Sequence, residues 1–315
     1  MNTSQDNMNG WINLDKDAGL TSTQALGKIK RLLNIKKRGP KVGHAGTLDP
    51  LATGCLPVAI GEATKTISFA QDKTKIYEFD VSWGASRTTD DLEGDIVHIS
   101  DDRPDEAAIV SLLSGYTGEI DQLPPQFAAV KVDGQRAYDI AREGKHANIQ
   151  SRQVTIHSFD ILHHSPDTTR FQVVCGKGVY IRALARDLGE DLGCYGHISH
   201  LRRLKVGPFD EKSMITLDNL EKIVHSGDLQ TALQPVETML DDIPALNLTQ
   251  DEAARLKQGQ NLAFVSRPHV ARLEEAGIEV GACTAVKAYA NFRGQAIALI
   301  DVEGTKVKPA RILNI

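Results

Sequence analysis

One segment of the sequence alternates apolar and polar residues without a break, and it constrains the fold more than any other. In "IYEFDVSW", residues 76–83, the side chains of Tyr77, Phe79, Val81 and Trp83 fall on one side and polar side chains on the other. Because successive side chains of a strand point to opposite faces, this pattern predicts a half-buried strand. The chain is therefore expected to contain a sheet whose apolar face is covered.

Further elements are predicted before and after this strand. Residues 11–16 have a short strand pattern, and the segment that follows predicts a helix behind Thr or Ser caps. Residues 170–193 predict a strand, a glycine turn and a second helix. The core stripe of this helix consists of Ile181, Leu184, Leu188 and Leu192. Arg182 and Arg186 lie beside the stripe, four residues apart.

The length of 315 residues predicts more than one domain. A main body is expected over residues 1–240. Within it, the proline pair of "DQLPPQFAAVKVDG" predicts that residues 121–152 leave the body as a loop and a helix. From 241 to 315 the composition changes to short β-like pieces, which predict a small β-rich domain.

The net charge of −5 argues against a uniformly basic protein, but the charges are segregated. Residues 27–41 carry seven Lys or Arg and no acid, and a second basic run lies at 200–205. Acidic residues gather at 88–106. A single basic run is typical of a solvated helix face, whereas two that converge in the fold would attract phosphates.

The cysteines and histidines predict neither a disulfide framework nor a metal site. The four cysteines form no CxxC pair and are expected to be buried and reduced, and the histidines have no Cys or carboxylate partners at ligand spacing. The four cysteines are Cys55, Cys175, Cys194 and Cys283. No stretch approaches the roughly 20 apolar residues of a membrane span, and the polar first residues lack the features of a signal peptide, so a cytoplasmic protein is expected.

A glycine-rich run, "GHAGTLDPLATGCLPV", contains a single carboxylate, that of Asp49. Pro50 disfavours a helical conformation at Asp49, and the glycines allow tight turns or a close approach of backbone. The local residues favour a structural Asp that bonds its own turn, and a catalytic acid is the alternative. A nucleotide-binding loop is excluded, because Glu62 stands where the Walker motif requires Lys.

Two other residues have a structural and a catalytic interpretation. Arg182 is either a surface arginine or the partner that keeps a carboxylate ionised and orients it through a fork of donors. Tyr77 is either a core tyrosine or a ring that stacks on a flipped base.

Six segments together resemble the bacterial tRNA pseudouridine synthase TruB family. In chain order they are "LDKDAGLTS", "GHAGTLDPLATGCLPVAIGEATK", "KIYEFDVSWG", "TDDLEGD", "CGKGVYIRALARDLG" and "HISHLRRLKVGPF". The resemblance covers residues 10–240 well and the C-terminal segment weakly. It implies an α+β fold, mixed α/β, with a largely antiparallel central sheet and a PUA-like C-terminal domain. Asp17 and Thr88 depart from the family pattern, which usually has Pro and Asp there.

The resemblance also implies an activity and an active site. The activity is conversion of the uridine at position 55, in the T loop of tRNA, to pseudouridine, without metal or cofactor. Asp49 matches the catalytic aspartate, Arg182 the arginine that pairs with it, and Asp91 the acid that completes this network. Tyr77 matches the tyrosine that stacks on the target base.

Other positions match residues that bind the substrate. Tyr180 and Leu201 match residues that line the base pocket, and His44 matches the histidine that fills the space left by the flipped nucleotide. Lys16, next to Asp17, is expected to bind substrate as well. The family fold makes 121–152 an RNA-clamping element, and both basic runs are expected to contact the T arm. A monomer with no obligate protein partner and no membrane contact is expected.

The chemistry fits so sparse a set of residues. Breaking the bond from C1′ to N1 and remaking it to C5 needs one nucleophile, an exposed base and exclusion of water. Attack at C1′, attack at C6 and elimination all remain open, as does the group that accepts the C5 proton, for which Tyr77 is the family analogy.

Three alternatives are weighed. A non-catalytic tRNA-binding or tRNA-folding module would have no reason to keep Asp49, Tyr77 and Arg182 together. An aspartate-dependent glycosidase would need two paired carboxylates. A related synthase that acts on another RNA, such as a guide-directed one, is less natural with so short a C-terminal region.

Overall fold

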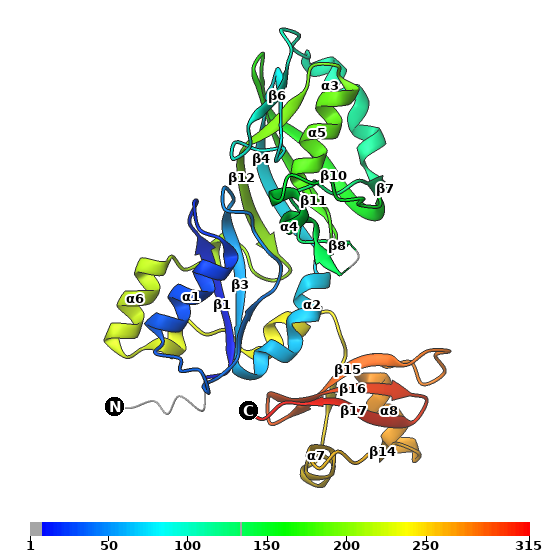
Figure 1. The fold of residues 1–315 in the computed structure, drawn as a ribbon. Helices are drawn as coiled ribbons and strands as arrows, with labels where there is room; N and C mark the ends of the chain where they lie inside the picture. Colours follow the sequence, from blue (N-terminus) through cyan, green and yellow to red (C-terminus); the bar gives the residue numbers. More distant parts are fainter. Residues whose placement is uncertain (1–7, 133) are drawn as a thin grey trace.

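The computed structural model describes residues 8–132 and 134–315 and is built around one large sheet (Figure 1). Its strand order is β1 (Gly10–Lys16), β3 (Thr53–Ile60), β12 (Gly196–Val206), β4 (Lys75–Trp83), β11 (Thr168–Cys175), β10 (Arg152–Ser165) and β7 (Gly118–Gln122). A short eighth strand, β2 (Val42–His44), pairs with β3. Every pair is antiparallel except β3 with β12. The expected α+β fold with a largely antiparallel central sheet is confirmed.

The alternating segment forms the central strand β4, as predicted. Phe79 and Val81 are fully buried, and the ring of Phe79 lies 5.4 Å from Phe171 and 5.9 Å from Phe159. Tyr77 lies near the start of the strand and is half-buried. The apolar face of β4 therefore packs in the core, except where Tyr77 reaches the edge.

Helices cover the sheet and use the predicted caps and stripes. Helix α1 (Ser22–Leu32) begins with a capping box formed by Thr21 and Gln24, and it lies beside α6 (Leu217–Ser226). Helix α5 (Ile181–Asp191) packs on β12, with Leu184 and Leu188 in the same core as Phe79. The other elements of the main body are α2 (Ile67–Asp72), α3 (Glu106–Leu113) and the hairpin β5 (Ala85–Arg87) with β6 (Ile96–Ile99).

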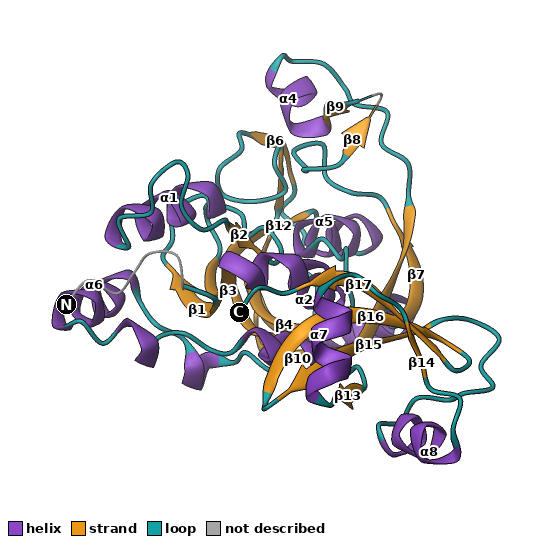
Figure 2. Cartoon of the chain, turned by 90° about the horizontal axis from the view of Figure 1, so that it is seen from below, coloured by secondary structure: helices purple, strands orange, loops and turns teal. Residues whose placement is uncertain are grey.

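Between β7 and β10 the chain leaves the sheet and returns. This excursion contains β8 (Lys131–Val132), β9 (Gln135–Arg136) and the short helix α4 (Ala137–Arg142), and it stands apart from the sheet in Figure 2. Its small core consists of Ala137, Ala147 and Ile149. The stretch that contains the proline pair has no regular structure, as its sequence predicts.

The C-terminal part forms a second sheet, in the order β13 (Ala245–Asn247), β15 (Val286–Phe292), β16 (Gln295–Glu303), β17 (Lys306–Ile312) and β14 (Leu262–Ala263). Helices α7 (Gln250–Lys257) and α8 (Arg267–Glu275) accompany it, and it has a hydrophobic core of its own. The β-rich C-terminal region is confirmed, whereas the domain boundary near 241 and the likeness to a PUA domain stay predictions.

An apolar cluster joins the C-terminal sheet to the main body. Trp11 of β1 is fully buried in this cluster together with Leu240, Ala296 and Leu299. Close by, the Lys65 ammonium donates a hydrogen bond of 2.7 Å to the carbonyl of Ile312. Near Trp11, β1 is thus covered by the segment Val236–Leu240, against which β16 of the C-terminal sheet packs.

The cysteines differ in one case from the expectation. Cys55, Cys175 and Cys194 are buried and free, but Cys283 is exposed. The prediction of a buried thiol was wrong for Cys283 because this residue lies in the loop before β15, outside the C-terminal core. Within residues 8–132 and 134–315, no helix has the length and hydropathy needed to cross a membrane.

Replacing Phe171 by alanine tests the packing of the central sheet. Phe171 is fully buried against Phe79, so Phe171→Ala should lower the free energy of unfolding by about 3–5 kcal/mol. Urea denaturation followed by tryptophan fluorescence measures it, since both tryptophans lie in the main body. Leu162→Ala, at a position 49% exposed on β10, is the control and should change stability by less than about 0.5 kcal/mol.

Candidate active site

A cleft of about 610 Å³ opens where the loop before β3, the start of β4 and the start of α5 meet. It is lined by five of the predicted site residues, Asp49, Tyr77, Tyr180, Arg182 and Leu201. They come from segments far apart in the sequence. Asp91, His44 and Lys16 do not line this cleft but lie around it.

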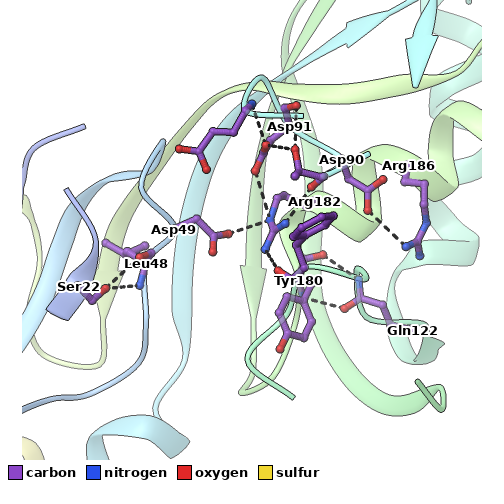
Figure 3. A network of polar contacts seen from close by, with 12 residues as sticks. Ser22, Leu48, Asp49, Asp90, Asp91, Gln122, Tyr180, Arg182 and Arg186 are labelled. Atoms are coloured by element: carbon purple, nitrogen blue, oxygen red, sulfur yellow. Dashed lines mark hydrogen bonds and ion pairs between the residues drawn. The ribbon is translucent and has the colours of Figure 1, made fainter. Parts of the chain in front are cut away.

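The loop that carries Asp49 is anchored on both sides of the carboxylate. The Ser22 hydroxyl donates to the Leu48 carbonyl and accepts from the Leu48 N–H, both at 2.9 Å (Figure 3). After the loop turns, the N–H of Ala52 donates to the Asp49 carbonyl at 3.1 Å. The side chain of Asp49 is 33% exposed, so its carboxylate faces the cleft from a fixed backbone.

Lys16 holds this loop by hydrogen bonds from the interior of the protein. The residue is fully buried, and its ammonium donates hydrogen bonds to the carbonyls of Asp17, Leu20 and Pro50 at 2.7–3.3 Å. Burial lowers the pKa of Lys16 to about 8, against the opposing effect of Asp49. A group so enclosed positions the Asp49 loop, and it reaches no surface at which it could contact substrate directly.

Arg182 connects three segments of the chain through one guanidinium. Its Nε donates to Asp49 Oδ2 at 2.9 Å, its Nη1 to the Thr89 carbonyl at 2.8 Å and its Nη2 to the Phe127 carbonyl at 2.9 Å. Asp91 Oδ2 lies 3.6 Å from the same Nε. The predicted network of Asp49, Arg182 and Asp91 is therefore brought together in space.

Most of this network is buried, and its one guanidinium faces two carboxylates. Arg182 is 4% exposed and Asp91 only 1%. Burial disfavours the charged guanidinium, but the carboxylates of Asp49 and Asp91 outweigh this effect and raise the pKa of Arg182. Asp91 is itself held by the Thr89 hydroxyl at 2.5 Å and the Glu93 N–H at 3.0 Å.

Tyr77 forms the floor of the cleft together with an arginine that the sequence analysis did not single out. Arg203 stands directly across from Tyr77 in the register of β12 with β4, and its guanidinium lies 6.0 Å from the centre of the Tyr77 ring. Burial raises the pKa of Tyr77, and Arg203 only partly opposes this. The phenol of Tyr77 is accordingly protonated at neutral pH.

Arg203 is 1% exposed and fixes the backbone around the cleft. It donates to the Cys55 carbonyl at 2.6 Å and to the Gly46 carbonyl at 3.1 Å. Gly54 makes this approach possible, because a Cβ there would lie 2.3 Å from the Arg203 carbonyl and the backbone φ is +96°. One signal could have found Arg203: it stands two residues after Leu201 on one strand, and thus on the same face.

Tyr180 is held in place by both ends of the 121–152 excursion. The Gln122 side chain donates to the Tyr180 carbonyl at 3.0 Å and accepts from its N–H at 2.7 Å. The Arg152 guanidinium lies 4.7 Å from the centre of the Tyr180 ring. Gln122 and Arg152 are cross-strand partners on β7 and β10, where the excursion begins and ends. The root of the excursion, meaning these two ends, therefore holds a residue of the cleft.

His44 lies on β2, before the Asp49 loop, and is half-buried. Burial first, and then Arg203, lower the pKa of His44, so the ring is neutral at pH 7. Its Nδ1 is buried and makes no hydrogen bond within the described part of the chain.

The two basic runs differ in how their side chains are placed. In residues 200–205, Arg203 is buried in the site, and Arg202 binds Asp15 at 3.0 Å and Glu211 at 2.9 Å. Arg202 and Arg203 are thus engaged within the protein, while His200 and Lys205 of this run are exposed, and contact of the run with the T arm stays a prediction. Residues 27–41 do form a basic surface, with a cleft of about 540 Å³ lined by Lys30, Lys36, Lys37 and Lys41.

Further positive charges line the main cleft. They are Lys75, Arg152 and Lys177, and Lys177 binds Asp72 at 2.8 Å. Burial, and then Arg203, lower the pKa of Lys75 to about 8. In the described residues no three His, Cys, Asp or Glu side chains are grouped so that they could hold a metal ion.

A largely antiparallel sheet with one carboxylate–arginine pair in a cleft fits the pseudouridine synthase class, and comparisons with known proteins agree. Residues 30–181 match the model of the N-terminal domain of the TruB family pseudouridylate synthases, and residues 182–241 match that of the tRNA pseudouridylate synthase B C-terminal domain. The chain belongs to the TruB family of pseudouridylate synthases.

Relatives of nearly full length support this assignment. The chain is 47% identical to the tRNA pseudouridine synthase B of Rhodopseudomonas palustris, over 98% of this chain and 81% of the relative. It is 44% identical to that of Agrobacterium fabrum, over 98% of this chain and 95% of the relative.

Solved structures show the same fold. One is an H/ACA RNP bound to a substrate RNA containing 2′-deoxyuridine, with a TM-score of 0.73 at 23% identity, covering 97% of this chain and 85% of that one. Another is a Cbf5–Nop10–Gar1 complex, with a TM-score of 0.72 at 26% identity, covering 96% and 84%.

The fork of Arg182 can be tested by a change that keeps its charge. Lysine cannot reach Asp49, Thr89 and Phe127 at once, so Arg182→Lys should lower the rate of pseudouridine formation about 100-fold, since each charge-assisted hydrogen bond contributes about 1.5–3 kcal/mol. Tritium release from 5-tritiated uridine in a tRNA transcript measures the rate. The exposed Arg170, which binds Asp80 through two nitrogens, is the matched control, and Arg170→Lys should leave the rate unchanged. A near-normal rate for Arg182→Lys would refute the pairing.

Proposed function

We propose that this protein converts the uridine at position 55, in the T loop of tRNA, to pseudouridine, and that Asp49 is the nucleophile. Membership of the TruB family and relatives named tRNA pseudouridine synthase B support the substrate. The observation that carries the proposal is the pair of Asp49 and Arg182, in which a buried guanidinium holds a carboxylate that is open to the cleft.

The reaction is an isomerisation and uses no external reactant. The bond from C1′ to N1 breaks, the uracil turns, and a bond from C1′ to C5 forms, while C5 loses a proton and N1 gains one. Arg182 holds one oxygen of the Asp49 carboxylate by a hydrogen bond and so orients the group for any of three chemical paths, in which Asp49 attacks C1′, attacks C6 or promotes elimination.

The uracil ring would lie between the aromatic ring of Tyr77 and the apolar side chain of Leu201. Tyr77 and Leu201 stand on the neighbouring strands β4 and β12, and Tyr180, just before α5, also lines the cleft. Stacking on Tyr77, and His44 in the space left by the nucleotide, would offset an unstacking cost of a few kcal/mol. The raised pKa of Tyr77 suits stacking better than proton abstraction by a preformed phenolate.

The remaining parts of the chain serve RNA binding in this proposal. Residues 1–240 carry the catalytic domain, residues 121–152 clamp the RNA, and residues 241–315 form the PUA-like domain. The lysine-lined cleft of residues 27–41 would bind phosphates of the T arm. We place the protein in the cytoplasm as a monomer that needs no protein partner.

Replacing the nucleophile should separate chemistry from binding. Asp49→Asn removes the charge but little volume, so tritium release from a T-arm transcript should cease, while the Kd for tRNA should change less than about threefold. Turnover that survives in Asp49→Asn would refute the nucleophile. Full binding by a wild-type protein that never forms pseudouridine would instead support the tRNA-folding module.

Salt dependence tests the basic cleft of residues 27–41. Lys36→Glu/Lys37→Glu should weaken tRNA binding and reduce the slope of log K against log[salt] by about 2, roughly one per lost phosphate contact. Filter binding at several salt concentrations measures the slope. Lys212→Glu/Lys222→Glu makes the same change in net charge at exposed sites outside this cleft and should leave the slope unaltered. Equal slopes for the two double variants would refute the assignment.

A further inference from the structure

A second arginine–aspartate pair lies beside the first, one helical turn further along α5. We propose that Arg186 and Asp90 are positioning residues that clamp the turn at residues 88–91 and the root of the 121–152 excursion against α5. They would thereby hold Arg182 in the geometry that orients Asp49. The inference rests on the proposed roles of Asp49 and Arg182 and adds a pair that acts through them.

The contacts of the two arginines are parallel. Arg186 Nη1 lies 3.5 Å from Asp90 Oδ2 (Figure 3). Its Nη2 donates to the Leu123 carbonyl at 2.8 Å. Arg182 likewise donates to Thr89 in the same turn and to Phe127 in the same excursion. Side chains four residues apart share one face of a helix, so each segment is held at two points.

The turn that carries Asp90 needs such restraint. Asp90 has a φ of +61°, a left-handed conformation that few residues other than glycine adopt. Its carbonyl accepts a hydrogen bond of 3.0 Å from the N–H of Ile198 on β12, which fixes the other side of the turn. Thr89 and Asp91, its neighbours, both contact Arg182, so a shift of Asp90 would displace partners of Arg182.

The electrostatics of Asp90 make it dependent on Arg186. Burial raises the pKa of Asp90 to about 6, although Arg186 and Arg182 oppose this; Asp187 and Asp91 add to the rise. The charged carboxylate thus depends on the two arginines, and loss of Arg186 would raise the pKa of Asp90 further. Arg186 is itself fixed by Asp187 at 2.7 Å.

The same pair connects the cleft to the excursion. Gln122 clasps Tyr180, Leu123 binds Arg186 and Phe127 binds Arg182, so three positions at the root of the excursion are attached to the start of α5. A movement of the excursion against RNA would therefore change the hydrogen bonds of both arginines. In this way RNA contact by the excursion and the orientation of Asp49 become coupled.

A double-mutant cycle tests the clamp. In Arg186→Gln and Asp90→Asn, the single-turnover rate of pseudouridine formation should fall about tenfold, while the Kd for a T-arm transcript stays within twofold. Asparagine tolerates the left-handed φ of residue 90, so the backbone is kept. Because the two residues act as one unit, the double variant should be about as slow as either single variant, not 100-fold slower than wild type. The charge-retaining Arg186→Lys should recover part of the loss.

A second measurement does not depend on activity. Amide hydrogen exchange in residues 88–95 and 122–128 should speed up in Arg186→Gln, in Asp90→Asn and in the double variant. It should stay unchanged in Arg170→Gln, which breaks an exposed ion pair with Asp80. Four results would each overturn the clamp. They are wild-type rates in the variants, a rate in the double variant that is the product of the two single losses, a Kd that rises as the rate falls, and unaltered hydrogen exchange. Absence of pseudouridine with the wild-type protein would refute the proposed function instead, and exchange would still decide whether the clamp exists.

Discussion

The ion pair between Asp49 and Arg182 is the interaction on which the rest of the site depends. A guanidinium that is 4% exposed would cost several kcal/mol without compensation, and here every nitrogen has a partner. Its partners come from the loop before β3, the turn after β5 and the excursion after β7. Satisfying one buried charge therefore draws three distant segments together, and the cleft forms where they meet.

The sheet supplies the rigid half of this arrangement. Tyr77, Leu201 and Arg203 stand on two hydrogen-bonded strands, and Arg203 also binds the backbone on either side of the Asp49 loop. The loops supply the other half. In the Asp49 loop, Leu48 and Ala52 are buried in the main core, and buried polar groups add to this packing: Lys16 donates to the Pro50 carbonyl and Ser22 to the Leu48 carbonyl. An acid that is alone in its loop is thus held by groups that are far away in the sequence.

Local patterns predicted the parts of the fold that local physics determines. The alternation of residues 76–83 and the cap at Thr21 gave the correct strand and helix, because side-chain period and capping act over a few residues. The pairing of Asp49 with Arg182 spans 133 positions and was accessible only through the family resemblance. Arg203 was misjudged because a count of charges does not say which face of a strand a charge occupies, and the dependence of Asp90 on Arg186 is visible only in three dimensions.

The strand order has a consequence for how the protein is made. Strand β12 lies between β3 and β4, although it follows both of them by more than 100 residues. Because a domain is synthesised from its N-terminus, the centre of the sheet must stay open on the ribosome until residue 206 has emerged. Only then do Leu201 and Arg203 complete the floor beside Tyr77, so a nascent chain that already carries Asp49 has no assembled cleft in which to engage RNA.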